Sequence, residues 1–391
     1  MAAGSAAVVG RGAFADRSTQ ASAAVDVPDV VVAGTAAGLT VLGGTRRRAF
    51  GRAAVAGGQD VYVVTGGSLM RLDPANWVTA RSIAVGDGWI PRVVSGDGGS
   101  CALGRTPASV RPAARTSSPL LVTTQERPRR YDLGGVVEPD AFTSDGAGLF
   151  VREWLPASAP DRYRVRLLDL PTGVLQPLLT RAKLPVPAGA EEEMRGEGRQ
   201  AVLSPGREIL YTLYTHQPGH QHTRDLIAGR PSHVHAFVHV LHLTERWAYC
   251  LDLPRPFGEG PAEGHAIAIS PDGRCLAVID ADSGSLAYAD TEALTISRVV
   301  QLFRVSGAAS LLFGPDLLFG VGAEVTVLDT ATDKVKGTWP VPSAVRGLGL
   351  SPDASRVYAG GDGEVVWLDA RSGALRGRAE VPGLTALHQV R

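Results

Sequence analysis

The residues best suited to chemistry are histidines, and they are concentrated in one segment. Eight of the nine lie between positions 216 and 265. Three of them follow the spacing H-x3-H-x-H, which can bring two or three imidazoles around one ion. Imidazole is a ligand for Zn, Ni, Fe and Cu. We therefore expect a divalent transition metal to bind here, with candidate ligands His216, His220, His222, His233 and His235.

The same segment and the one before it hold acidic and basic residues that could assist a reaction. A metal-bound hydroxide would suit hydrolysis or lyase-type proton abstraction. The candidate catalytic residues are His216, His220, His222, Asp225, Glu197 and Arg199. Two simpler interpretations stay open: the loop histidines hydrogen-bond acidic neighbours without a ligand, and the run Glu191–Glu193 is solvated loop charge. The sequence contains no HExxH, CxxC, GxSxG or P-loop motif.

A repeated strand pattern must position these residues. Its clearest copies are AIAIS-PDGR-CLAVID at 266–280 and LGLS-PDAS-RVYAGG at 348–361. Third strands of the repeat end at Asp290, Asp329 and Asp369, which are 39 and 40 residues apart. Pro and Asp favour a tight turn after the first strand, and alternating apolar residues bury one face of each strand. Units of about 40 residues that cannot bury both faces alone stack radially, as in a β-propeller.

The predicted fold is therefore all-β, a single propeller of four-stranded blades. The segments Val30–Val41 and Leu384–Val390 are left over, and we expect these N- and C-terminal strands to meet and close the ring. The interval from Leu42 to Gly57 looks too short for two full strands, which favours seven blades; a separate terminal blade would give eight. The seven assigned units lie near 53–85, 91–133, 138–180, 199–253, 264–302, 308–341 and 344–381.

The S-P-D-G turns and the strands ending in Leu-Asp resemble those of the YVTN/WD40-like bacterial propeller repeat family. The resemblance covers residues of about 30–390, although no copy carries the Gly-His and Trp-Asp pair of true WD40 repeats. It implies the propeller fold and a general binding role. It implies no specific activity, because propellers serve many functions.

Two stretches interrupt the period. Residues 183–200 join the outer strand of one unit to the inner strand of the next, and residues 215–235 join the second and third strands of that next unit. In an up-and-down blade these connections leave from the same end of the strands. We therefore expect both insertions to cover one face, near the central channel. The expected organisation is a tail at 1–27 and one propeller domain at 28–391.

Composition excludes several classes. The 47 Gly and 26 Pro residues argue against a helix bundle, and 39 basic residues balance 39 acidic ones, which argues against nucleic acid as partner. Cys101, Cys250 and Cys275 are too few for a disulfide framework and read as buried, inert thiols. No apolar run is long enough for a transmembrane span. The Ala-rich stretch before Asp16 resembles a clipped export signal, so we expect an exported or envelope-associated protein, with a cytoplasmic one as the alternative.

Three hypotheses follow for function. The first is a monomeric binding module that engages a protein or small-molecule ligand on the face carrying the two insertions. The second is a metal-dependent enzyme of lyase or lactone/ester hydrolase type that uses the histidine-rich loop. The third is a structural propeller whose loops only cover the channel.

Overall fold

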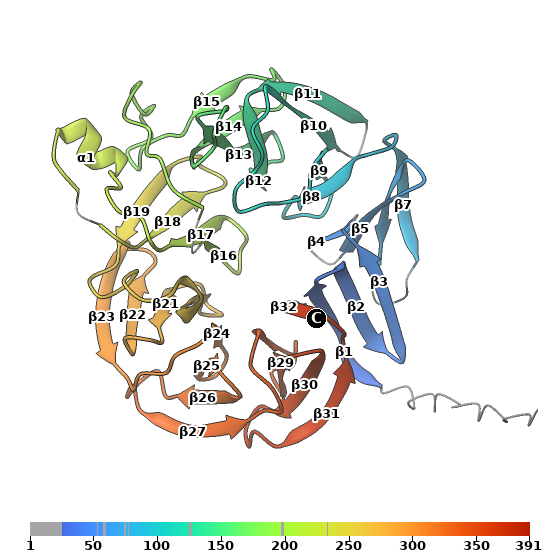
Figure 1. Cartoon of the computed structure of the whole chain (residues 1–391), viewed down its shortest axis with the longest axis vertical. Coiled ribbons are helices and arrows are strands. Elements are labelled where there is room, and N and C mark those ends of the chain that lie inside the picture. Colours follow the sequence, from blue (N-terminus) through green and yellow to red (C-terminus); the bar gives the residue numbers. More distant parts are fainter. Residues whose placement is uncertain are drawn as a thin grey trace, which may run out of the picture.

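The computed structural model describes residues 26–52, 54–57, 60–73, 76, 78–124, 127–196, 199–232 and 234–391. Within these residues the strands form eight four-stranded antiparallel sheets arranged as a closed ring (Figure 1). The predicted all-β propeller is thus confirmed, with the larger of the two blade counts. Residues 1–25 of the tail expected at 1–27, with the expected export signal, lie outside the described residues, whereas Val27 already begins a strand.

Seven blades are contiguous in sequence, and in each the strands run in chain order from the inner edge to the outer edge. The first three are β4 (Ala54–Gly57), β5 (Asp60–Thr65), β6 (Ser68–Leu72) and β7 (Thr79–Ala84); β8 (Ile90–Val94), β9 (Cys101–Gly104), β10 (Ser117–Thr123) and β11 (Pro128–Gly134); and β12 (Val136–Phe142), β13 (Gly148–Leu155), β14 (Arg162–Asp169) and β15 (Leu175–Pro177).

The next four blades continue around the ring. They are β16 (Gln200–Leu203), β17 (Ile209–Tyr214), β18 (Phe237–His242) and β19 (Ala248–Asp252); β20 (His265–Ile269), β21 (Cys275–Asp280), β22 (Ser285–Asp290) and β23 (Thr295–Gln301); β24 (Ala309–Phe313), β25 (Leu317–Val321), β26 (Glu324–Leu328) and β27 (Val335–Pro340); and β28 (Gly347–Leu350), β29 (Arg356–Gly360), β30 (Glu364–Asp369) and β31 (Leu375–Glu380).

The eighth blade contains strands from both ends of the chain, as expected for the ring closure. Its members are β1 (Val27–Thr35), β2 (Gly38–Gly44), β3 (Arg46–Gly51) and β32 (Leu384–Val390). The C-terminal β32 pairs antiparallel with β1 and forms the inner edge of this sheet. The interval 42–57 does accommodate both β3 and β4, because these strands are only six and four residues long.

The repeated turn residues have a defined role. Ser270 Oγ donates to Asp272 Oδ1 at 2.6 Å and accepts from the Cys275 N–H at 2.9 Å, which closes the turn between β20 and β21. Ser351 and Asp353 repeat this geometry between β28 and β29. Side-chain bonds of this kind stabilise local turns, so the S-P-D pattern forms the same hairpin in different blades.

The aspartates that end the third strands also act through turns. Asp369 Oδ1 accepts from the N–H groups of Arg371 and Ser372, at 3.1 and 3.0 Å. Asp290 and Asp329 accept in the same way from the N–H groups of the residues two and three positions later. Each aspartate therefore directs the chain from the third strand into the outer strand.

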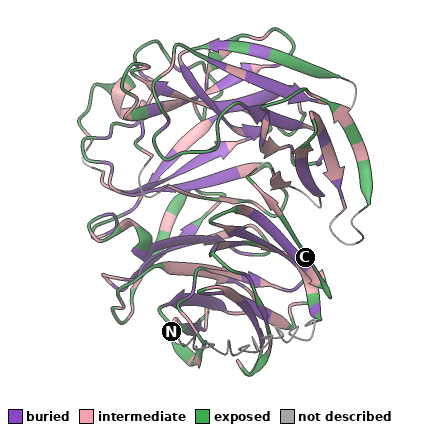
Figure 2. Cartoon of the chain, turned by 45° about the vertical axis from the view of Figure 1, so that its right-hand side comes forward, coloured by how far each residue is buried: buried purple, intermediate pink, exposed green. Residues whose placement is uncertain are grey.

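The core lies between neighbouring blades. Figure 2 shows the middle strands of the blades mostly buried and the outer strands largely exposed. The second and third strands, such as β25 and β26, bury nearly every residue, whereas the outer strand β27 alternates exposed and half-buried positions. Strands that are packed on both faces have continuous apolar sequences, and this is why the repeat can be recognised in the sequence.

Helical structure among the described residues is limited to α1 (Thr223–Ala228) and a 3₁₀ turn, η1 (Ala262–Gly264). Neither is long or apolar enough to cross a membrane. The helix α1 belongs to the second insertion. Figure 1 shows it outside the ring beside β19, and not over the central channel as we expected. The reason is that the first insertion starts from an outer strand, β15, and α1 bonds to another outer strand, β19.

Candidate metal centre

The two insertions contact each other directly at the outer edge of the β16–β19 blade. Met194 exchanges two backbone hydrogen bonds of 2.8 Å with Tyr163, which fixes the first insertion on β14. The buried Gln217 side chain then joins the insertions, because it accepts from the Arg195 N–H at 2.8 Å and donates to the Arg195 carbonyl at 3.0 Å. The two insertions therefore lie against each other, but at the outer edge of the ring and not near the central channel as we expected.

Four side chains with metal-binding atoms converge where the insertions meet β19. They are Glu192 from the first insertion, His220 and His222 from the second, and Cys250 from β19. One donor atom of each lies within 4.8 Å of the donor atoms of the other three. Glu192 Oε2 is 3.3 Å from both His220 Nε2 and His222 Nδ1, and 3.0 Å from Cys250 Sγ. The two imidazole nitrogens are 3.1 Å apart.

The outer nitrogen of each histidine is held by an acceptor. His220 Nδ1 lies 3.0 Å from the Glu193 carbonyl oxygen, so in a neutral, metal-bound imidazole Nδ1 would keep the proton and Nε2 would supply the lone pair. His222 Nε2 lies 2.6 Å from Asp252 Oδ1, which favours the proton on Nε2 and leaves Nδ1 for a ligand. Histidines that bind metals in proteins are oriented by such partners.

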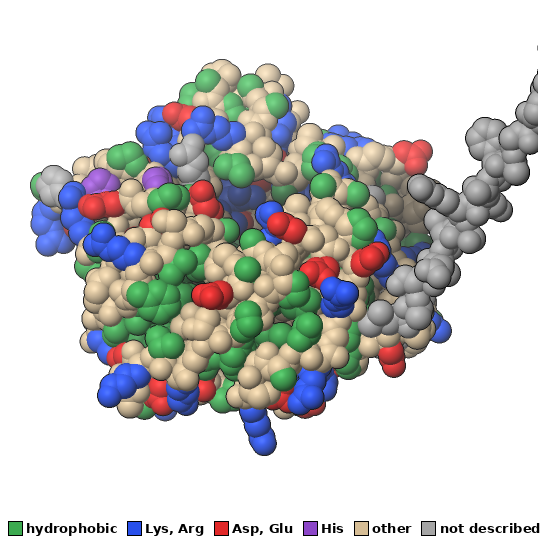
Figure 3. Space-filling model, turned by 60° about the horizontal axis from the view of Figure 1, so that its bottom comes forward, with side chains coloured by type: hydrophobic (Ala, Val, Ile, Leu, Met, Phe, Trp, Pro, Cys, Tyr) green, Lys and Arg blue, Asp and Glu red, His purple; other side chains and the backbone are tan. Residues whose placement is uncertain are grey.

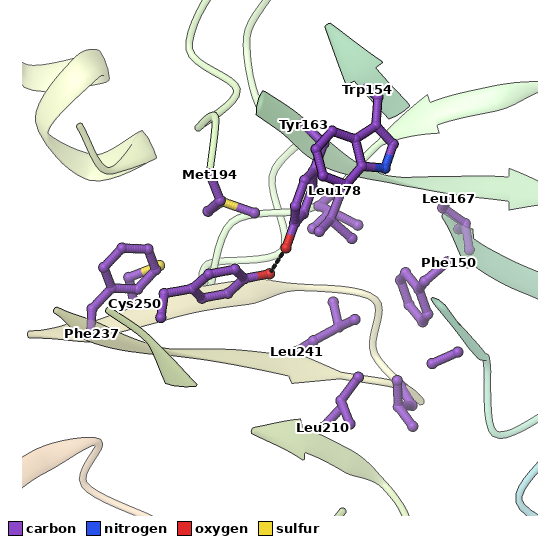
Figure 4. Close-up of a cluster of buried hydrophobic side chains, with 14 of the residues drawn as sticks. Phe150, Trp154, Tyr163, Leu167, Leu178, Met194, Leu210, Phe237, Leu241 and Cys250 are labelled. Atoms are coloured by element: carbon purple, nitrogen blue, oxygen red, sulfur yellow. Dashed lines mark hydrogen bonds between the residues drawn. The ribbon is translucent and has the colours of Figure 1, made fainter. Parts of the chain in front are cut away.

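Further contacts fix the orienting groups. The guanidinium of Arg224 donates to Asp252 and, at 2.6 Å, to the Cys250 carbonyl. The His220 ring stacks on Phe237 with centroids 4.3 Å apart, and the His222 ring meets the same phenyl ring edge-on at 5.0 Å. Figure 4 shows Phe237 next to Cys250 in the apolar cluster beneath the site. The rings are therefore confined by packing as well as by hydrogen bonds.

Burial and hydrogen bonding shift the protonation of this cluster. Burial would raise the pKa of Glu192, but hydrogen bonds from His220 and His222 outweigh it and hold the pKa well below its ordinary value. Burial opposes the charged form of His222, yet bonds to Asp252 and Glu192 raise its pKa. Burial and the neighbouring Glu192 carboxylate raise the pKa of the Cys250 thiol well above its usual value. The metal-free cluster is therefore an ion pair with a protonated thiol.

The donor set matches a tetrahedral transition-metal site. Zinc binds nitrogen and oxygen at about 2.0–2.2 Å and sulfur at about 2.3 Å, so tetrahedral ligand atoms lie roughly 3.3–3.8 Å apart. The four measured separations of 3.0–3.3 Å need only a small expansion. A binding ion would take the place of the protons on Cys250 and His222, which is the usual exchange at such sites.

The remaining candidates from the sequence lie apart from this cluster. His216 Nδ1 is 2.9 Å from Thr215 Oγ1, and its ring faces His265 at 6.4 Å. His235 Nε2 accepts from Arg255 Nη2 at 3.0 Å. Neither histidine belongs to the four-donor cluster.

Of the other candidates, Asp225 forms ion pairs with Arg224 and Arg230, and Arg199 binds Asp140 at 2.7 Å. The side chains of Asp225 and Arg199 are therefore already neutralised by ion pairs outside the cluster. Glu197 and His233 lie outside the described residues.

Glu192, Cys250 and Asp252 were not among the site candidates from the sequence, which interpreted Glu192 as loop charge and Cys250 as an inert thiol. Of the flanking glutamates, only the exposed Glu193, which pairs with Arg162, is a solvated loop charge. Glu191 and Glu192 are each 11% exposed, but Glu191 pairs with Arg164 and Arg166 whereas Glu192 turns toward the histidines. Cys250 could have been found from the register of the strands, because β19 pairs it with His239 of β18, one of the clustered histidines.

A cavity of about 290 Å³ adjoins the metal-binding cluster. Its walls include Glu192, His222 and Cys250, together with aliphatic side chains of the first insertion and of β14 and β19. A second, more open pocket of about 310 Å³ reaches His220 from the other side and is lined by Arg162, Glu193 and Gln217 among others. The cluster thus lies between an apolar and a polar space. In Figure 3 the visible histidine side chains lie on one side of the molecule among charged residues.

Comparison with known proteins supports the fold. No family model matches the sequence. No curated protein matches it either. Among solved structures the chain is similar to apo AztD from Citrobacter koseri, with a TM-score of 0.54 and 10% identity over 93% of this chain and 97% of that one. At this identity the likeness shows the propeller fold alone.

Two further structures are similar at lower scores. Dihydro-heme d1 dehydrogenase NirN, in complex with DHE, has a TM-score of 0.48 and 17% identity over 93% of this chain and 74% of that one. A functionally unknown protein from Desulfotomaculum acetoxidans has a TM-score of 0.42 and 12% identity over 85% and 98%.

Proposed function

We propose that this protein is a β-propeller that binds one transition-metal ion, best matched by Zn²⁺, through Glu192, His220, His222 and Cys250. The observation that carries the proposal is the placement of the two histidine rings. Each has one ring nitrogen close to an acceptor and the other directed at the same small space, which also receives a carboxylate and a thiol. Two nitrogens, one oxygen and one sulfur suit zinc better than magnesium or calcium.

Four protein donors make binding a better assignment than metal-dependent catalysis. Catalytic zinc keeps three protein ligands and a water, whereas four ligands complete a tetrahedral site. The lyase or hydrolase alternative requires an open coordination position for hydroxide. The proposal thus keeps the metal of the second hypothesis but assigns to it binding instead of catalysis. The ion would join the first insertion, the second insertion and β19.

The decisive experiment is a zinc titration of the metal-free protein against a chromogenic chelator. We expect one ion per chain, and Cys250→Ser should weaken binding by more than the roughly 10–100-fold that loss of an orienting partner costs. Substitution of Co²⁺ should add a thiolate-to-metal charge-transfer absorption that Cys250→Ser removes.

The chain offers matched controls. Cys275 is another free cysteine and His216 another histidine of the same insertion, and neither belongs to the cluster. Cys275→Ser and His216→Gln should therefore bind zinc as the wild type does. Less than about 0.1 ion per chain, or binding that His216→Gln abolishes and Cys250→Ser leaves intact, would refute the proposed site.

A further inference from the structure

The apolar cavity beside the cluster has a preformed shape. It is bounded by β14, the start of the first insertion, β19 and α1, and its aliphatic lining includes Val165, Leu178, Val186, Met194 and Ala248. Its volume of about 290 Å³ is close to the lower end of small-molecule sites. Water gains few hydrogen bonds in such surroundings, so a compact apolar group would be the better occupant.

A buried imidazole also lines the cavity. His239 is 2% exposed, and its ring meets the Tyr214 ring edge-on with centroids 6.4 Å apart. Each nitrogen of an imidazole can donate or accept a hydrogen bond, so His239 can bind a polar atom of a ligand.

Positive charge gathers around Tyr249, which also lines the cavity. The guanidinium groups of Arg181 and Arg224 each lie 5.5 Å from the centroid of the Tyr249 ring. Arg224 is neutralised by Asp252 and Asp225. The exposed Arg181 has no carboxylate within ion-pair distance among the described residues, and its guanidinium reaches only the Glu292 carbonyl at 3.5 Å. An anion bound here would supply the missing partner.

We infer that this cavity binds a small organic acid, with its apolar body between the aliphatic walls and its carboxylate at Arg181. A straight chain of about six to eight carbons suits the volume. His239 provides a hydrogen bond to a polar atom along the body of the natural ligand. This inference goes beyond metal binding. Three proposed donors, Glu192, His222 and Cys250, also line the cavity, but the groups assigned to the acid, Arg181 and the aliphatic walls, are not metal donors.

The experiment is calorimetric titration of butyrate, hexanoate and octanoate, with octanol as the uncharged comparison. Each added methylene should tighten binding about fourfold until the cavity is full. The acid should bind more tightly than the alcohol, and Arg181→Gln should weaken octanoate about threefold or more while leaving octanol unchanged. The control is Arg304→Gln, an exposed arginine away from the cavity, which should change neither.

Two variants fill the cavity from opposite walls, Ala248→Phe on β19 and Val186→Phe on the first insertion. Both should abolish octanoate binding while thermal unfolding remains cooperative. Octanoate binding that survives both substitutions, or the absence of any binding at millimolar concentration, would overturn the inference. Equal affinity for octanol and octanoate would overturn the assignment of an anion.

Zinc titration of the same samples separates this inference from the proposed function. If the protein binds zinc but not octanoate, only the inference about the cavity is refuted. If it binds octanoate but not zinc, only the proposed metal centre is refuted.

Discussion

Replacement of Asp252 by asparagine tests the metal centre without touching a donor atom. In the native site one carboxylate oxygen lies 2.6 Å from His222 Nε2, and the other accepts from Arg224. Arginine has only donors, so the asparagine must turn its oxygen toward Arg224 and its amide NH₂ toward His222. His222 Nε2 must then accept, which moves the imidazole proton to Nδ1. That nitrogen is the proposed metal ligand.

The size of the effect follows from this change of tautomer. Substitution of a group that orients a metal-binding histidine typically costs about 10–100-fold in metal affinity. This range corresponds to roughly 1.4–2.7 kcal/mol. We expect Asp252→Asn to fall within it, because three donors remain in place and His222 can still bind after paying for the less favourable tautomer.

The assay is the chelator competition at fixed pH, with Asp225→Asn as the control. The Asp225 carboxylate also pairs with Arg224 and with Arg230, and its only bond to a cluster histidine is a backbone one to the His222 carbonyl, which asparagine keeps, so its substitution reports the effect of loosening α1. Wild-type affinity in Asp252→Asn, together with loss of binding in Cys250→Ser, would refute the reasoning. It would mean that His222 does not bind through Nδ1.

Three further predictions concern stability. The raised pKa of His222 means that its charged form stabilises the metal-free protein fully below its ordinary pKa of about 6.5, and that this contribution is lost as pH rises through the raised value. The free energies of unfolding in urea of the metal-free wild type and His222→Gln should therefore converge above that pH, and a constant difference across pH would contradict this. Zinc affinity should instead increase with pH, because the ligands lose protons when the metal binds. Asp29→Ala removes the ion pair to Arg356 and the hydrogen bond from Tyr358, and should cost about 1–3 kcal/mol in urea unfolding, whereas the exposed Asp353→Ala should cost less. Zinc at 100 times its Kd should raise the free energy of unfolding by about 2.7 kcal/mol, and an unchanged melting temperature would argue against a native-state site.

Most of the fold could be predicted because its determinants are local. The side chain of Ser270 bonds to residues two and five positions away, and that of Asp369 to residues two and three positions away. Such contacts leave a direct trace in the sequence. The blade count was harder, because it depended on whether short strands such as β3 and β4 form in a brief interval.

The metal centre was only half predictable for the same reason. His220 and His222 are two residues apart, and their pattern is visible in the sequence. Cys250 joins them through the register of β18 and β19, and Glu192 through the path of an irregular loop. Neither the register nor the path follows from residue types. The sequence also offers nothing to distinguish Glu192, which contacts the histidines, from Glu191 and Glu193, which pair with arginines.

The position of β32 has a consequence for biosynthesis. The inner strand of the eighth blade is Leu384–Val390, whereas its other strands begin at Val27. During translation β1 therefore presents an unpaired inner edge until residues 384–390 have been made, and exposed edges are sites of aggregation. The four proposed metal donors, in contrast, all lie between residues 192 and 250. The nascent chain can thus assemble its metal centre on the ribosome well before the ring closes.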